Sequence, residues 1–138
     1  FDKRMAGYAA MKEGMQAPNI TFSNNSTLYD LPSEKTIVVF WASWCPHCME
    51  EMPKLNAWAK ENPNTKVVAI SLDEDQTAYE TTIQQFPNIL HHTDLKKWEG
   101  KVVNEYYIYG TPTFIVLDKD KKIVGKYADF KAIEKMNK

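Results

Sequence analysis

The residues of this 138-residue chain most suited to chemistry are its only two cysteines, Cys45 and Cys48, in the stretch WASWCPHCMEEMP. Two thiols at this spacing can form a structural disulfide, bind a metal ion or exchange disulfides with other thiols. A disulfide between them would close a very small loop, and the stabilisation by a cross-link grows with loop length. A structural bridge here would therefore add little to the stability of the fold.

A metal site is the second interpretation of the cysteine pair. Structural zinc normally has four protein ligands. Besides the two cysteines the sequence offers His47, His91 and His92, and it has no second Cys-x-x-Cys pair. This ligand set is incomplete, so we expect no resident metal and no other cofactor. A copper-binding, metallochaperone-like module that uses the same thiolate pair remains the alternative function.

The elements around the cysteines favour the third interpretation, which is thiol–disulfide exchange. Apolar runs at 37–41 (IVVFW) and 67–72 (VVAISL) predict buried central strands. Between them the apolar spacing Cys48, Met52, Leu55, Ala59 predicts an amphipathic helix over residues 45–61. Strand, helix and strand in this order predict a parallel β-α-β unit, with the cysteines at the point where the first strand gives way to the helix.

The rest of the chain completes an α/β pattern with a mixed sheet. We expect one domain over residues 1–138, in which residues 1–17 are a lead-in segment or a loosely docked helix. The further predicted elements are a helix at about 75–86, a weaker helical pattern from Val102 to Tyr107, a hairpin of strands 113–117 and 122–127, and a short helix at about 129–137.

A cysteine at the start of a helix is favoured as a thiolate. The first four backbone N–H groups of a helix lack partners, and the helix dipole is positive at this end. Thiols of Cys-x-x-Cys pairs at such positions have lowered pKa values. His47, if protonated or donating to the sulfur of Cys45, would act in the same direction. Thiol–disulfide exchange alone accounts for the strand, the turn, Cys45 at the helix start and Cys48 one turn later.

Composition excludes several other classes of function. Lysine and arginine total 17 against 18 aspartates and glutamates, without a long block of either sign, so we expect no nucleic-acid partner. No apolar run approaches the roughly 20 residues of a membrane helix. The chain starts at Phe1, which suggests a mature form or an excised domain, so a signal peptide or an anchor would lie outside it.

The stretch FWASWCPHC, which continues into CMEEMPKL, resembles the active-site strand and helix of the thioredoxin superfamily. EYYIYGTPTFIVLDKDKKIVGKY is similar to the cis-proline loop and terminal hairpin of that family, and the resemblance covers residues from about 36 to 127. The stretches MQAPNITF and VVAISLDED are similar to the ResA- and TlpA-like thioredoxins of the bacterial envelope. The resemblance implies a thioredoxin fold, with a central mixed β-sheet flanked by α-helices and a ResA/TlpA-type insertion between about 73 and 105.

The resemblance also implies roles for individual residues. Cys45 attacks a substrate disulfide as a thiolate, and the more buried Cys48 resolves the mixed disulfide. Thr111 and Pro112 match the cis-proline turn, which presents the backbone of residue 111 to the substrate as an added strand. Trp44 is expected to flank the cysteines as an exposed apolar contact for substrates, whereas Trp41 belongs to the core.

Two departures from the family pattern bear on the mechanism. Thioredoxin has a buried aspartate where this chain has Val39, so another group must take the proton. Glu51 is the candidate because it follows Cys48 by three residues and shares its helical face, although it could be a solvated helix glutamate instead. The dipeptide Pro46-His47 matches the oxidising enzyme DsbA. We therefore expect a relatively oxidising couple for this subgroup, with the net direction left open.

The expected partners are protein thiol or disulfide substrates and a redox partner protein, and we expect a monomer. Disulfides persist in oxidising compartments. The bacterial envelope or periplasm is therefore the expected location, with or without a membrane anchor outside this chain, and the cytoplasm is the less expected one. His91 and His92 are interpreted as solvated loop residues outside the site.

Overall fold

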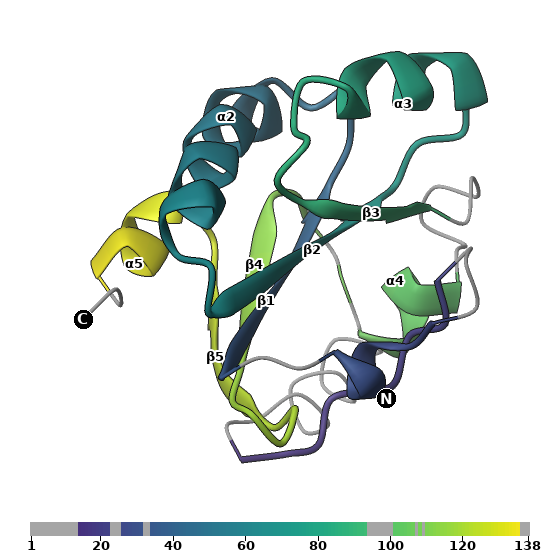
Figure 1. The fold of residues 1–138 in the computed structure, drawn as a ribbon. Helices are drawn as coiled ribbons and strands as arrows, with labels where there is room; N and C mark the ends of the chain where they lie inside the picture. Colours follow the sequence, from purple (N-terminus) through teal and green to yellow (C-terminus); the bar gives the residue numbers. More distant parts are fainter. Residues whose placement is uncertain are drawn as a thin grey trace.

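The structure is a computed structural model that describes residues 14–22, 26–31, 34–93, 101–106, 108 and 110–135. Its centre is a five-stranded sheet with the strand order β3-β2-β1-β4-β5 (Figure 1). In chain order the elements are the 3₁₀ helix η1 (Leu28–Asp30), β1 (Lys35–Trp41), α2 (Pro46–Glu61), β2 (Thr65–Ser71), α3 (Gln76–Ile83), β3 (Leu90–Thr93), α4 (Lys101–Glu105), β4 (Thr113–Leu117), β5 (Ile123–Tyr127) and α5 (Phe130–Lys135).

The sheet is mixed, as predicted. β1 pairs in parallel with β2, from Lys35 opposite Thr65 to Trp41 opposite Ser71, and antiparallel with β4. β2 pairs in parallel with β3, and β4 forms an antiparallel hairpin with β5. β1 and β2 therefore end at the same edge of the sheet. The turn that leads to the cysteines starts at this edge, beside the segment that follows β2.

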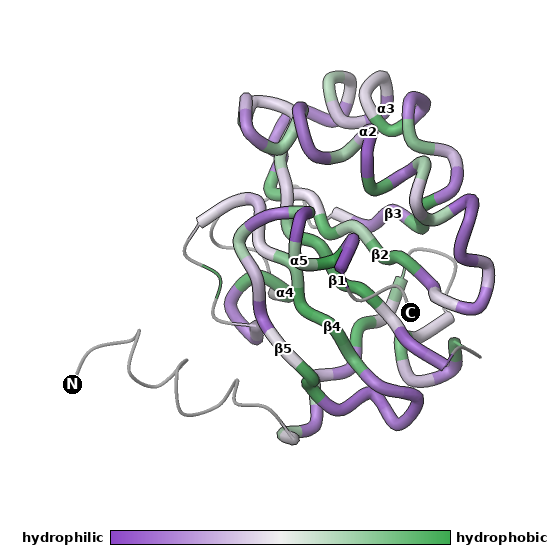
Figure 2. Tube along the Cα trace, turned by 90° about the vertical axis from the view of Figure 1, so that its left-hand side faces the viewer, coloured by the Kyte–Doolittle hydropathy of each residue, from purple (hydrophilic) through white to green (hydrophobic). Residues whose placement is uncertain are grey.

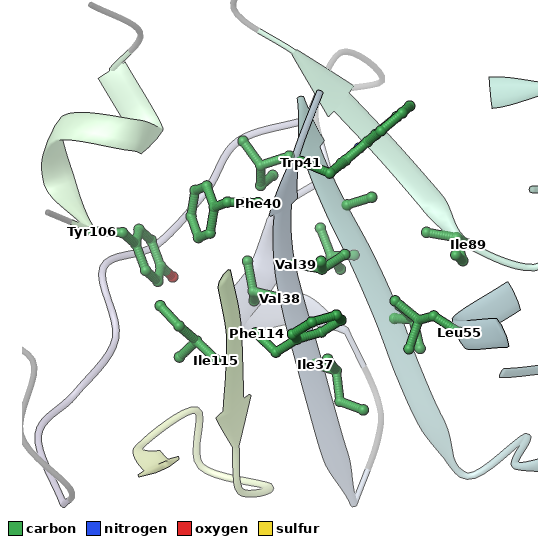
Figure 3. Close-up of a cluster of buried hydrophobic side chains, with 14 of the residues drawn as sticks. Ile37, Val38, Val39, Phe40, Trp41, Leu55, Ile89, Tyr106, Phe114 and Ile115 are labelled. Atoms are coloured by element: carbon green, nitrogen blue, oxygen red, sulfur yellow. The ribbon is translucent and has the colours of Figure 1, made fainter. Parts of the chain in front are cut away.

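β1 is buried along its length, because every residue after Lys35 is enclosed. Its side chains alternate between two apolar layers, one on each face of the sheet. Figure 3 shows Phe40 and Tyr106 on one side of β1, and Trp41 and Leu55 on the other. The Phe40 and Tyr106 rings have centroids 5.4 Å apart. The continuous apolar run of the sequence is thus explained by a strand covered on both faces.

Helices cover both faces of the sheet. Figure 1 shows α2 and α5 together on one side, and α4 with η1 on the other. The inner face of α2 is formed by Cys48, Glu51, Met52, Leu55, Trp58 and Ala59, which includes all of the predicted apolar positions. Figure 2 shows hydrophobic residues concentrated along β1, β2 and β4, at the centre of the molecule. The active-site helix is thereby fixed to the sheet through its apolar side.

The prediction for His91 and His92 was wrong. They do not lie in a loop but in β3, where they pair with Ala69 and Ile70 of β2. Both side chains are partly buried, and the His91 ring lies against Trp41 with centroids 6.3 Å apart. Burial lowers the pKa of His91, while the contact of Nε2 with the Phe86 carbonyl oxygen at 2.8 Å acts in the opposite direction. The neutral ring is therefore a packing element of the sheet edge.

The other predicted elements are observed close to their expected bounds. Segment 73–105 contains α3, β3 and α4, although residues 94–100 lie outside the described residues. Of the predicted lead-in segment, residues 1–13 are also outside them. Residues 14–17 are not helical but hydrogen-bond to residues 121–123, beside the start of β5. In the described part of the chain no helix is long and apolar enough to cross a membrane.

Candidate active site

The turn after β1 places Cys45 at the N-cap of α2. The backbone N–H of Cys45 donates to the Ala42 carbonyl oxygen at 3.1 Å, which closes the turn, and α2 begins at Pro46. Proline suits this first helical position because its fixed φ is helical and no N–H is lost. The Cys45 sulfur accepts a hydrogen bond from the backbone N–H of Cys48 at 3.2 Å. The sulfur thus takes the place that an oxygen occupies at most helix N-caps.

The two cysteines differ in exposure. Both are free thiols, and Cys48 is fully enclosed whereas Cys45 keeps 7% of its surface exposed. Trp44, which directly precedes Cys45 in the sequence, is 47% exposed, while Trp41 is fully buried. The predicted burial order of the two cysteines and the predicted positions of the two tryptophans are thus observed.

The environments of the two sulfurs also shift their pKa values in opposite directions. Burial raises the pKa of Cys45, but hydrogen bonds from Cys48, Thr111 and the backbone of His47 outweigh burial and place it below the ordinary thiol value. Burial, followed by the adjacent Cys45 sulfur, raises the pKa of Cys48 to about 12. Near neutral pH, therefore, Cys45 is the one that can act as a nucleophile.

The loop before β4 lies against the cysteines. The peptide bond between Thr111 and Pro112 is cis, as the resemblance implied. The Thr111 carbonyl oxygen is 3.7 Å from the Cys45 sulfur, within reach of a thiol hydrogen bond. Thr111 is partly exposed and Pro112 is buried. The backbone of residue 111 therefore lies next to the reactive sulfur, at the molecular surface.

Glu51 is buried on the inner face of α2, with 6% of its surface exposed, so the interpretation as a solvated helix glutamate was wrong. Its Oε1 accepts a hydrogen bond from the Phe130 backbone N–H at 3.0 Å, at the start of α5. His47 Nε2 lies 3.5 Å from the same oxygen, and Lys54 Nζ lies 3.5 Å from Oε2. The carboxyl group is thereby fixed beneath the start of α2.

The sequence analysis missed a second buried carboxyl group, that of Asp73, which is 1% exposed. It lies in the segment after β2 and accepts hydrogen bonds from Ser43, in the turn before the cysteines. The available signal was topological. Asp73 directly follows a predicted parallel strand, and the ends of neighbouring parallel strands meet at one edge of the sheet.

The described residues provide no further ligands for a metal ion at the two cysteines. Among the described residues, no group of three or more histidines, cysteines, aspartates or glutamates is placed to hold a metal ion. His91 lies in the sheet and points its Nε2 at the Phe86 carbonyl oxygen. Within the described residues, the copper-binding alternative therefore rests on the two sulfurs alone.

Comparisons with known proteins agree with the geometry of the site. A family model described as thioredoxin-like matches residues 33–123. The thiol-disulfide oxidoreductase ResA of Bacillus cereus is 32% identical over 133 residues, which cover 87% of this chain and 74% of the relative. The chain belongs to the thioredoxin superfamily, as a ResA-like member.

Further similarities lie within the same superfamily. The sporulation thiol-disulfide oxidoreductase A of Bacillus subtilis is 30% identical over 65% of this chain and 56% of its own length. The crystal structure of a domain of a possible thiol-disulfide isomerase from Cytophaga hutchinsonii superposes with a TM-score of 0.77 at 30% identity, covering 93% of this chain and 92% of that domain. The predicted thioredoxin fold and thiol–disulfide oxidoreductase activity are thus confirmed at the level of the family.

The opposite pKa shifts predict unequal labelling of this ResA-like protein. When the reduced protein is treated with iodoacetamide at pH 7, Cys45 should react at least about a hundredfold faster than Cys48, because the thiolate is the nucleophile. With a pKa of about 12, Cys48 has a thiolate fraction on the order of 10⁻⁵ at this pH. Peptide mass spectrometry at successive times measures both rates. Comparable labelling of the two thiols would contradict the assignment.

Proposed function

We propose that this chain exchanges disulfides with protein substrates through an attack by Cys45 and a resolution step by Cys48. The observation that carries the proposal is the difference between the two sulfurs. Cys45 keeps 7% of its surface exposed and has a lowered pKa, whereas Cys48 is fully enclosed with a pKa raised to about 12. A structural disulfide would not need this difference, whereas a two-step exchange does, because the first thiol must be ionised before the substrate arrives.

The exchange takes two steps. The Cys45 thiolate attacks one sulfur of a substrate disulfide, the substrate S–S bond breaks, and one substrate sulfur leaves as a thiolate. Cys48 then loses its proton and attacks the Cys45 sulfur of the mixed disulfide. The Cys45–Cys48 disulfide forms, the second substrate sulfur leaves, and the substrate has gained two electrons. When the protein acts as an oxidant, the same steps run in reverse.

The resolving step needs a proton acceptor. Part of the pKa increase at Cys48 is caused by the neighbouring Cys45 sulfur, and this part is lost once Cys45 is bound in the mixed disulfide. Burial still disfavours the Cys48 thiolate. Val39 offers no acceptor on the sheet side, and Glu51 is buried on the same face of α2 as Cys48. We assign Glu51, directly or through a water molecule, to the removal of the Cys48 proton.

Trp44, Thr111 and Pro112 form the proposed contact surface for substrates. Trp44 offers an exposed apolar ring beside Cys45. The Thr111 backbone lies next to the Cys45 sulfur, where an extended peptide could pair with it as an added strand. Such main-chain pairing accepts many sequences, which suits an enzyme that acts on protein thiols and disulfides. The substrates and the redox partner that regenerates the protein are therefore proposed to be proteins.

We place the protein in the bacterial envelope, as a monomer whose anchor, if there is one, lies outside this chain. The basis is the ResA-like membership together with chemistry that needs a compartment where disulfides persist. For the direction of exchange we propose a relatively oxidising couple. Each contact that stabilises the Cys45 thiolate stabilises the reduced form, and so makes the disulfide a stronger oxidant.

Substitution of each cysteine tests the two-step scheme. Cys45→Ser should abolish reduction of a model protein disulfide, because no thiol at the surface remains to attack. Cys48→Ser should also lose turnover but should accumulate mixed disulfides between Cys45 and the substrate, which non-reducing gels and mass spectrometry detect. Reversal by dithiothreitol is the control. The scheme is wrong if Cys48→Ser traps no substrate or if Cys45→Ser retains activity.

Two substitutions of His47 separate the effect of its backbone N–H on the pKa of Cys45 from the effect of its imidazole. His47→Pro removes a backbone N–H that lowers the pKa of Cys45, and also the imidazole, whereas His47→Ala removes the imidazole alone. Both should raise the thiol pKa and make the couple more reducing, with the larger effect in His47→Pro. One pKa unit corresponds to about 1.4 kcal/mol, which is about 30 mV for this couple. Equilibration with glutathione measures the potential, and an unchanged potential in His47→Pro contradicts the proposed tuning.

Glu51→Gln tests the proton acceptor. The amide oxygen can still accept from the Phe130 N–H, so the link to α5 is kept while the acid–base group is lost. We expect resolution of the mixed disulfide to slow about tenfold or more near neutral pH, within the usual range for a lost general base, and to follow pH differently. Glu50→Gln, on the exposed side of α2, is the matched control. Identical pH–rate profiles for wild type and Glu51→Gln would remove Glu51 from the mechanism.

A further inference from the structure

The carboxylate of Asp73 is enclosed behind the turn that carries Trp44 and Cys45. Asp73 follows β2 by two residues and is 1% exposed. Its Oδ1 accepts from the Ser43 backbone N–H at 3.1 Å and from the Ser43 hydroxyl at 2.5 Å. Its Oδ2 accepts from the Ser71 hydroxyl, and the Asp73 N–H donates to the Ser71 Oγ at 2.9 Å. Both oxygens are thus used, by donors from the ends of two strands.

A buried carboxylate is costly unless hydrogen bonds compensate for the water it has lost. Here the donors are one backbone N–H and two hydroxyl groups, and hydrogen bonds to a charged acceptor are stronger than those between neutral groups. Tyr79 of α3 is a titratable neighbour of Asp73. Burial first, and then the charges of Asp73 and Glu80, raise its pKa to about 12, so this side chain stays neutral. The compensation therefore comes mainly from the two serines.

The turn that hydrogen-bonds to Asp73 is also held by contacts on the strand side and on the helix side. On the strand side, the Leu72 N–H donates to the Trp41 carbonyl oxygen at 2.8 Å, which extends the pairing of β1 and β2. On the helix side, the Cys45 N–H donates to Ala42 and the Cys45 sulfur caps α2. Ser43 is the residue between these points whose backbone and side chain both reach Asp73. Its position sets the path of the next two residues, Trp44 and Cys45.

We propose that Asp73 is a positioning residue for thiol–disulfide exchange, which acts through Ser43 to hold the Cys45 sulfur against the backbone N–H groups at the start of α2. The inference rests on the proposed role of Cys45 as the attacking thiolate. Without the carboxylate, the Ser43 N–H and hydroxyl lose their acceptor. The turn then gains freedom, and the sulfur spends less time in the geometry that stabilises its charge. A residue 30 positions from Ser43 in the sequence thus helps to set the reactivity of the Cys45 thiol.

The test compares Asp73→Ala, Asp73→Asn and Ser43→Ala with wild type. The measurement is the rate of Cys45 alkylation by iodoacetamide between pH 4 and 10, together with the reduction potential and the melting temperature of the reduced protein. Asp73→Ala should raise the apparent pKa of Cys45 by about one unit, which is roughly a tenfold slower reaction at a pH below both values. Asp73→Asn retains one carbonyl oxygen for Ser43, so it should restore most of the wild-type profile.

A distant core substitution separates positioning from a general loss of stability. Leu28→Ala, in η1, removes a fully buried side chain and should lower the melting temperature without moving the alkylation profile. If Asp73→Ala lowers the melting temperature but leaves the profile and the potential at wild-type values, the proposal is overturned. Should Asp73→Ala fail to fold, Ser43→Ala still decides, because an unchanged alkylation profile in this variant would overturn the proposal as well.

A double-mutant cycle tests whether the effect runs through Ser43. The Asp73→Ala/Ser43→Ala protein should shift the profile by little more than Asp73→Ala alone, because both changes disrupt one set of contacts. Fully additive shifts would overturn the route through Ser43. Wild-type alkylation separates this outcome from failure of the proposed function. If Cys45 of the wild type reacts no faster than an ordinary thiol, the proposed function fails, whereas a reactive Cys45 that is unaffected by Asp73 overturns only the positioning role.

Discussion

The hydrogen bond from the Cys48 backbone N–H to the Cys45 sulfur is the interaction on which the chemistry of this protein depends. It exists only because β1 ends at Trp41 and α2 begins at Pro46, which leaves the sulfur at the N-cap. The first N–H groups of a helix need an acceptor, and a negative charge at this end is favoured by the helix dipole. The Cys45 thiolate therefore accepts a hydrogen bond from an otherwise unpaired N–H of the helix, and this end of the helix in turn stabilises the negative charge of the sulfur. The sheet contributes by fixing the strand end from which the turn departs.

The same helix makes the second sulfur unlike the first. Cys48 lies one turn further on and faces the core, where burial disfavours a charge, and its pKa is about 12. Each unit of this shift corresponds to about 1.36 kcal/mol in favour of the protonated form. Ionisation of both thiols is thereby prevented, so the proton of Cys48 leaves only after Cys45 has reacted. The order of the two steps follows from position along α2, since the side chains themselves are identical.

The success of prediction from sequence depended on how local each feature is. β1, β2 and α2 are encoded in continuous or periodic apolar patterns, and the cysteines and Glu51 are placed by spacing along one helix. The cis bond before Pro112 was predicted by resemblance alone. β3 was missed because LHHT is short and polar, and it becomes a strand only by pairing with β2 at the edge of the sheet. The contact between Ser43 and Asp73 joins segments 30 residues apart, and no local pattern encodes it.

Val39 offers no carboxyl group, and among the described residues the two enclosed carboxylates are Glu51 and Asp73, whose contacts suit them to different tasks. Asp73 uses both oxygens on the serines, so protonating it would break contacts that hold the turn. Glu51 directs one oxygen to the Phe130 N–H, and its other oxygen lies 3.5 Å from Lys54, whose side chain is 62% exposed. An acid–base group must reach water to exchange its proton, and Glu51 lies beside His47 and Lys54, whose side chains are 56% and 62% exposed. The carboxylate beside exposed side chains is therefore the one suited to carry the proton, and the carboxylate bonded to the two serines is suited to hold the geometry.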